Sequence, residues 1–163
     1  MKINLMSLIG KTISLAMFTA IAIGACLAQE NSGGGRIAGT WDTRVAIINC
    51  QTGDVLDIHD SVGTFIAGGT FIDSASRIPQ ALKTPGQGIW KHIEGNTYRF
   101  KFKSFSFNPA GNFVGYVIID HEAILNSTAD VYESFGTAEI YDADGNLLAV
   151  GCSSTVSTRF KFD

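Results

Sequence analysis

The stretch Thr97-Tyr98-Arg99-Phe100-Lys101-Phe102-Lys103 decides the fold class. Aromatic rings alternate with basic side chains, and in an extended chain successive side chains point to opposite faces. One face of this segment therefore carries rings into a core, while the other carries charge into water. The pattern predicts a half-buried β-strand, and it makes the three basic residues a solvated strand face rather than a nucleic-acid patch.

The same period of two continues along the chain from Gly39 onward. One phase of a first run is formed by Trp41, Thr43, Val45 and Ile47, and one phase of a later run by Phe113, Val117, Ile119, Ala123 and Leu125. Turn sequences rich in Gly, Asn and Asp separate these runs, at 51–54, 68–69, 94–96, 107–113 and 141–147, which suits hairpin loops. The longest segment without a strand pattern, 76–87, is expected to form a lid or a short helical turn.

About eight strands, mostly linked by hairpins, predict a β-sandwich or a β-barrel. The strands are long for their number, their order is that of a meander, and closure removes sheet edges that would otherwise need protection. We therefore expect an all-β domain over residues 38–163, built as a single eight-stranded antiparallel up-and-down β-barrel.

The first 28 residues have the pattern of an export signal. Lys2 and Lys11 frame a basic leader, 12–25 is largely apolar, and small residues follow at 24–28. The apolar run is too short to cross about 30 Å of hydrocarbon comfortably. The sequence predicts a signal peptide over 1–28, a flexible Gly-rich tether over 29–37, and a secreted or periplasmic product.

One alternative for the leader stays open. Ile23-Gly24-Ala25-Cys26 is similar to the lipobox of bacterial lipoproteins, in which Cys26 would become the lipidated N-terminus. Cys26-Leu27-Ala28 also fits ordinary cleavage, and we favour export without a lipid anchor. A membrane is therefore expected as a partner only if Cys26 is lipidated.

Removal of the leader leaves 135 of the 163 residues, with ten Lys and Arg against fifteen Asp and Glu, a net charge of −5. Nucleic acids and anionic membranes both require clustered positive charge, so this balance argues against either as the main partner.

Two cysteines remain after the leader, Cys50 and Cys152, and in an exported chain they predict one disulfide. In a closed meander the first and last strands are neighbours, so the two thiols can meet. Strict alternation nevertheless points Cys50 outward and Cys152 inward with Val150 and Val156, which requires a bulge in one strand. Two buried free thiols are the alternative.

Three residues are candidates for acid–base chemistry. His121 lies on the apolar phase of its strand, and an imidazole in an apolar barrel has a lowered pKa and acts as a base or hydrogen-bond donor near neutrality. Tyr98 and Tyr116 are its expected partners. A structural role for His121 is the alternative, and His59 is expected to lie in a solvated loop. No spacing of His or Cys predicts a metal site, and no cofactor is expected.

A second set of residues is expected to line a pocket for a small apolar ligand. Its members are mostly aromatic and fall on inward phases: Trp41, Phe65, Phe71, Trp90, His92, Phe100 and Phe102. Gly136 and Ala138 on another strand leave room beside them. A filled core without a cavity is the alternative.

Gly39-Thr40-Trp41 resembles the G-x-W motif that opens lipocalins and related calycin barrels. The resemblance implies that Trp41 plugs the closed end of the barrel and that a basic residue of the last strand, Arg159, packs over it.

A resemblance over nearly the whole mature chain is to small exported bacterial proteins, largely uncharacterised, whose barrel is of the allene oxide cyclase and dirigent type. It rests on five segments: Asn49-Cys50-Gln51-Thr52-Gly53, Gly88-Ile89-Trp90-Lys91-His92, Phe105-Ser106-Phe107-Asn108, Gly151-Cys152 and Thr158-Arg159. This resemblance implies the barrel fold and assigns no catalytic residue.

Three functions are compatible with the sequence. The first is an exported barrel that binds a small hydrophobic molecule in its interior or mouth. The second is a cofactor-free cyclase or isomerase for a lipid, polyketide or terpenoid, which needs few catalytic groups because it mainly fixes the substrate's conformation. The third is a structural envelope or interaction protein, with a homo-oligomer as one form.

Overall fold

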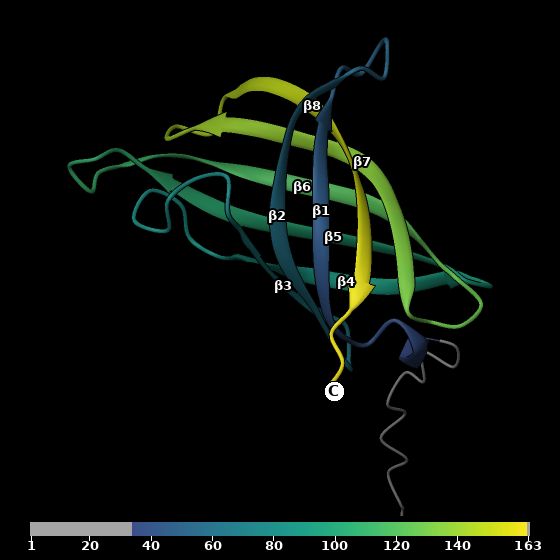
Figure 1. The fold of residues 1–163 in the computed structure, drawn as a ribbon. Helices are drawn as coiled ribbons and strands as arrows, with labels where there is room; N and C mark the ends of the chain where they lie inside the picture. Colours follow the sequence, from purple (N-terminus) through teal and green to yellow (C-terminus); the bar gives the residue numbers. More distant parts are fainter. Residues whose placement is uncertain (1–33, 163) are drawn as a thin grey trace, which may run out of the picture. The chain divides into compact units, whose positions relative to one another are not determined.

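The computed structural model describes residues 34–162, and within them eight strands form one closed barrel. Each strand pairs antiparallel with the next, and β8 returns to pair with β1 (Figure 1). The predicted all-β, up-and-down barrel is thus confirmed. The predicted signal peptide over 1–28 and Cys26 lie outside the described residues. No helix in the described part of the chain is long and apolar enough to cross a membrane.

The strands are β1 (Gly39–Ile48), β2 (Val55–Ile66), β3 (Thr70–Ala75), β4 (Gly86–Glu94), β5 (Thr97–Phe107), β6 (Phe113–Leu125), β7 (Val131–Asp142) and β8 (Leu147–Arg159). The turns after β2, β4 and β6 gather at one end of the barrel, which we call the closed end. The turns after β1, β5 and β7 and the 76–85 loop gather at the other, which we call the open end.

Strand β2 is longer than the sequence predicted. It begins at Val55, so His59 belongs to a strand and the expectation of a solvated loop there is wrong. The inward phase of this part of β2 consists of Asp57, His59 and Ser61, and such polar residues conceal the alternation of apolar and polar side chains that identifies a strand.

Strand β8 faces the other way from the prediction. Ser153, Thr155 and Ser157 are buried, whereas Val150 and Val156 are each 52% exposed. The inward assignment of the two valines was therefore wrong. Hydroxyl groups are accepted inside because they find hydrogen-bond partners there, as when Thr43 Oγ1 and Ser157 Oγ bond across β1 and β8 at 2.9 Å.

Cys50 and Cys152 form the predicted disulfide, with their Cα atoms 5.2 Å apart. In the β1–β8 ladder Ile48 pairs with Cys152, and the register runs without a shift from Trp41 to Ile48. Cys152 lies on the same outward phase as Ile48, and Cys50 follows Ile48 by two residues in the turn after β1. The pairing of β1 with β2 shifts register between Ile47 and Ile48, so the predicted irregularity occurs just before Cys50, although Cys152 lies on the outward phase.

The closed end is sealed around Trp41, which is completely buried. Its indole nitrogen donates to the carbonyl of Ile37 at 2.9 Å, and the guanidinium carbon of Arg159 lies 4.2 Å from its ring centre. Arg159 also donates to the carbonyls of Ala38 and Ala129, both at 2.7 Å. This is the arrangement of Trp and basic residue that the calycin resemblance implied.

The segment before β1 packs onto this end. A short 3₁₀ helix, η1 (Gly34–Arg36), is followed by Ile37, which is completely buried. The Arg36 guanidinium donates to Asn96 Oδ1 at 2.7 Å and to the Ser127 carbonyl at 2.7 Å. The flexible tether predicted over 29–37 is therefore wrong for residues 34–37, because burial of Ile37 and these hydrogen bonds fix them to the barrel.

The disulfide is expected to stabilise the fold strongly. It joins residues 102 positions apart, and in the loop-entropy model such a link contributes roughly 4–5 kcal/mol to the free energy of unfolding, with measured values often smaller. The Cys50→Ser/Cys152→Ser double variant should lose about 2–5 kcal/mol in urea unfolding. A double variant as stable as the oxidised parent would show that closure of the barrel does not depend on the link.

Candidate functional site

The candidate site is a cavity inside the barrel, of about 530 Å³, that lies toward the open end. Every strand except β4 contributes to its wall, as does the loop that contains Arg77, Ile78 and Lys83. Much of the wall is apolar, with members including Val45, Ile47, Phe71, Phe100, Phe102, Ile119 and Ala138. The segment 76–87 was predicted as a lid or helical turn. Residues 76–85 of it form a loop at the mouth of this cavity, and β4 begins at Gly86.

The aromatic residues predicted to bind a ligand divide into two groups. Phe71, Phe100 and Phe102 line the cavity. Phe65 lies beyond them toward the closed end, with its ring centroid 4.6 Å from that of Phe71 and 5.8 Å from that of Trp90. Phe65, Trp90 and Trp41 are thus core residues of the closed end and are not part of the cavity wall.

His92, the seventh residue of that set, lies near the β4–β5 turn at the closed end. Its Nε2 is 2.8 Å from the carbonyl of Gly95, and its ring centroid is 5.0 Å from that of Tyr98. The inward phase of β4 holds Trp90 at the core, and its indole nitrogen donates to the Ile66 carbonyl at 2.8 Å. Trp90 is the last residue of this phase that lies in the core, so His92, two residues further along β4, lies outside the core and outside the cavity wall.

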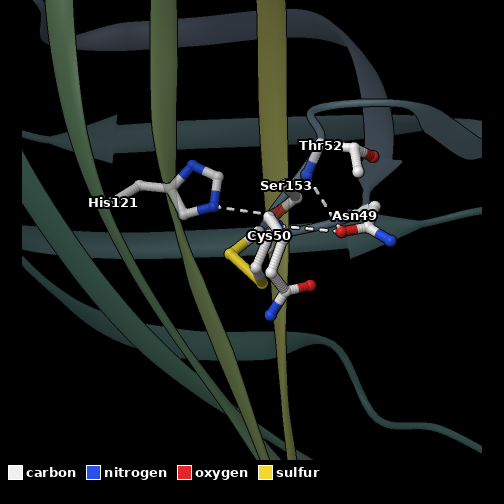
Figure 2. Close-up of a disulfide and its surroundings, with 7 residues drawn as sticks. Asn49, Cys50, Thr52, His121 and Ser153 are labelled. Carbon is white, nitrogen blue, oxygen red and sulfur yellow. Dashed lines mark hydrogen bonds between the residues drawn. A yellow bond between two sulfur atoms is a disulfide. The ribbon is translucent and has the colours of Figure 1, made fainter.

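His121 lines the cavity, as the alternation on β6 predicted, and is 2% exposed. Its Nε2 lies 2.9 Å from Ser153 Oγ (Figure 2). Its Nδ1 lies 2.9 Å from Ser134 Oγ. Ser134 is bonded in turn to Thr155 at 2.6 Å. We call these four residues the histidine–hydroxyl network. Burial lowers the pKa of His121 to about 4, so the ring is neutral at pH 7.

Gly136 makes the position of this imidazole possible. A Cβ atom at Gly136 would lie 2.5 Å from Cδ2 of His121 and 2.0 Å from the carbonyl oxygen of Asp120. Gly136 was expected to leave room for a ligand, and the structure shows that it makes room for the histidine ring. Ala138, two residues further on, does line the cavity.

The structure does not bring the three predicted acid–base residues together. Tyr98 is completely buried at the closed end, outside the cavity wall, and its ring centroid lies 6.2 Å from that of Trp90. Tyr116 lines the cavity near its mouth, five residues from His121 along β6, which is about 17 Å of strand. Its ring stacks on that of Tyr141 at 4.8 Å.

Two cavity residues that the sequence analysis missed are Asp73 and Lys83. Asp73, on β3, is buried and accepts a hydrogen bond from the Ser61 hydroxyl, and burial raises its pKa. Lys83, in the loop after β3, is half-buried, and burial lowers its pKa. A signal for Asp73 was present, because it shares the strand phase of Phe71. Lys83 comes from a loop, where no periodicity indicates direction.

Two further basic residues lie at the mouth of the cavity. His59 lines the wall, and its buried Nδ1 has no hydrogen-bond partner among the described residues. Burial lowers the pKa of its imidazole. The Nε atom of Arg77 donates a hydrogen bond to Oδ2 of Asp57 at 2.6 Å, so the two side chains form an ion pair.

Within residues 34–162, no group of three or more His, Cys, Asp or Glu side chains is arranged to hold a metal ion.

No protein-family model matches the chain, and no curated protein matches it. The closed eight-stranded barrel agrees with the calycin-like architecture that the sequence resemblance implied. The disulfide is compatible with an extracellular or periplasmic location.

Neutral His121 makes the stability of the protein depend on pH. Its pKa rises from about 4 in the folded chain to about 6.5 on unfolding, so between these values the unfolded chain binds more protons. Protonation of His121 should therefore have no effect on the free energy of unfolding above about pH 6.5. Below that pH, the free energy of unfolding should fall by up to about 1.4 kcal/mol per pH unit toward pH 4. Urea unfolding between pH 7 and 4.5 measures this slope.

The matched variant for this measurement is His121→Gln, which keeps hydrogen-bonding groups beside Ser134 and Ser153 but does not titrate. It should show a shallower decrease of stability over the same pH range, because all carboxyl groups are common to both proteins. Equal slopes in the two proteins would contradict a neutral, buried His121.

Proposed function

We propose that this chain is an exported bacterial barrel of the calycin-like kind that binds a small, largely apolar molecule in its interior, which it admits at the open end. The supporting observation is the cavity of about 530 Å³ with its aromatic and aliphatic wall. Ligand sites in proteins are usually concave, mostly apolar and about 300–1,000 Å³ in volume, with a few polar groups for orientation.

The division of the interior supports this proposal. Aromatic side chains are buried and packed against one another at the closed end, where Trp41, Phe65 and Trp90 lie. At the open end the same barrel leaves its wall without packing partners, and such a void loses the dispersion contacts that a filled core would make. A ligand that occupies the cavity would restore those dispersion contacts, so the hollow open end is suited to bind an apolar molecule.

Export is supported by the leader pattern of residues 1–28 and by the Cys50–Cys152 disulfide. A disulfide persists in oxidising compartments and is rare in the cytosol. A secreted or periplasmic location, with lipidation of Cys26 as the alternative, is part of the proposal.

A second candidate function is that of a cofactor-free cyclase or isomerase, and Asp73 is the observation that favours it. Burial raises the pKa of this carboxyl, and a buried acid beside an apolar cavity is suited to donate a proton to a bound substrate. His121 is less suited, because Ser134 and Ser153 already occupy both of its ring nitrogens.

The binding function is tested by filling the cavity. Ala138 lines the wall, so Ala138→Phe should place a ring in the space where the ligand lies. Titration with Nile red, a neutral apolar dye, should give binding with a blue-shifted emission in the parent. In the variant we expect affinity to fall by about tenfold or more, equivalent to about 1.4 kcal/mol.

The matched control is Ala46→Phe, because Ala46 lies on the outward phase of β1, opposite to the cavity-lining Val45 and Ile47. It should bind the dye as the parent does, with both variants checked for folding by thermal unfolding. If the parent does not bind the dye, or if both variants bind it equally well, the interior is not the binding site.

A further inference from the structure

Lys83 is held at the mouth of the cavity by the backbone on either side of it. The amide of Thr84 donates to the Phe105 carbonyl at 3.0 Å, and the amide of Phe107 donates to the Leu82 carbonyl at 2.8 Å. The Thr84 hydroxyl also accepts from the Phe105 amide at 3.0 Å. These bonds attach the loop to β5, so the lysine extends from a fixed position.

The ammonium group of Lys83 has no ion-pair partner in the described chain. The five ion pairs among residues 34–162 involve Arg44, Arg77, Arg99, Lys101 and Lys161. Lys83 is half-buried against the cavity, and its pKa is lowered because burial penalises its charged form. A partly desolvated cation without a counter-ion gains more from a ligand anion than an exposed lysine does.

Asp73 interacts electrostatically with Lys83 but forms no direct ion pair with it. No ion pair within 4.0 Å joins it to Lys83, and its carboxyl accepts from the hydroxyl of Ser61. Burial raises the pKa of Asp73, while its electrostatic interaction with Lys83 acts in the opposite direction.

Lys83 is the cation of the cavity wall that forms no ion pair among the described residues. The charged residues of the wall are Lys83, Arg77 and Asp73, and Arg77 is paired with Asp57 at 2.6 Å. His59 adds an imidazole beside them. A concave, low-dielectric mouth strengthens the attraction between the Lys83 ammonium and an anion that enters it.

We infer that the ligand is an anionic amphiphile, whose apolar body lies against Phe71, Phe100 and Phe102 and whose carboxylate head pairs with Lys83 beside Arg77 at the mouth. This inference rests on the proposed binding function. A cationic head would meet the unpaired ammonium of Lys83, and a neutral head would leave Lys83 without an ion-pair partner.

Displacement of Nile red by three ligands of equal chain length tests the head group. Dodecanoate should displace the dye from the parent protein at concentrations about tenfold lower than dodecanol, and dodecylamine should be weakest. In Lys83→Met, which keeps the length and apolar character of the side chain, dodecanoate should weaken to the level of dodecanol, while dodecanol stays within about twofold of its parent value.

Lys101→Met is the control, because Lys101 lies outside the cavity on β5 and pairs with Asp120 at 3.3 Å. It should keep the preference for dodecanoate, as should Lys83→Arg, which keeps the charge. Equal displacement by dodecanoate and dodecanol from the parent would overturn the head-group inference and leave interior binding intact. The tightest displacement by dodecylamine would overturn it in favour of Asp73, and failure of Nile red to bind would remove the proposed function itself.

Discussion

Pairing of β8 with β1 is the constraint on which the rest of the structure depends, because it converts a meander into a barrel with an inside. The ladder runs from Trp41 opposite Arg159 to Ile48 opposite Cys152, and each end is reinforced by a different interaction. The cation–π contact of Arg159 with Trp41 closes the bottom of the seam, and the disulfide to Cys50 links its top. Without this seam, β1 and β8 would be exposed edges.

Closure also explains why the interior wall of β8 carries hydroxyl groups. Ser153, Thr155 and Ser157 are small, so they leave space in the barrel that valine or leucine would fill. Their hydrogen bonds to neighbouring strands replace those that water would provide, which removes most of the penalty of burying them. The chain thus obtains a hollow open end while its outward valines remain half-exposed.

The sequence was sufficient for the fold and for part of the site. Alternation around Phe100 and His121 predicted the strands of the barrel, the inward face of His121 and the aromatic wall, because these parts of β5 and β6 follow the simple rule of apolar inside and polar outside. The start of β6 departs from the rule, since Phe113 was assigned to the inward phase and is 41% exposed. The rule failed in β8 and in the first half of β2, where polar side chains face inward. The rule also could not predict that Lys83 lines the cavity, because the direction of a loop residue depends on backbone contacts with residues far away in the sequence.

The polar groups of the cavity differ in whether they need a ligand. His121 and its hydroxyl partners satisfy one another, so a ligand gains little by displacing those bonds and the network acts as part of the wall. Lys83 and Nδ1 of His59 lack partners in the described chain, and both lie toward the open end. Buried polar groups without partners are costly in the free protein and favourable when a ligand completes them. Under the proposed function, a polar head group is therefore recognised at the mouth, whereas the interior selects only size and apolar character.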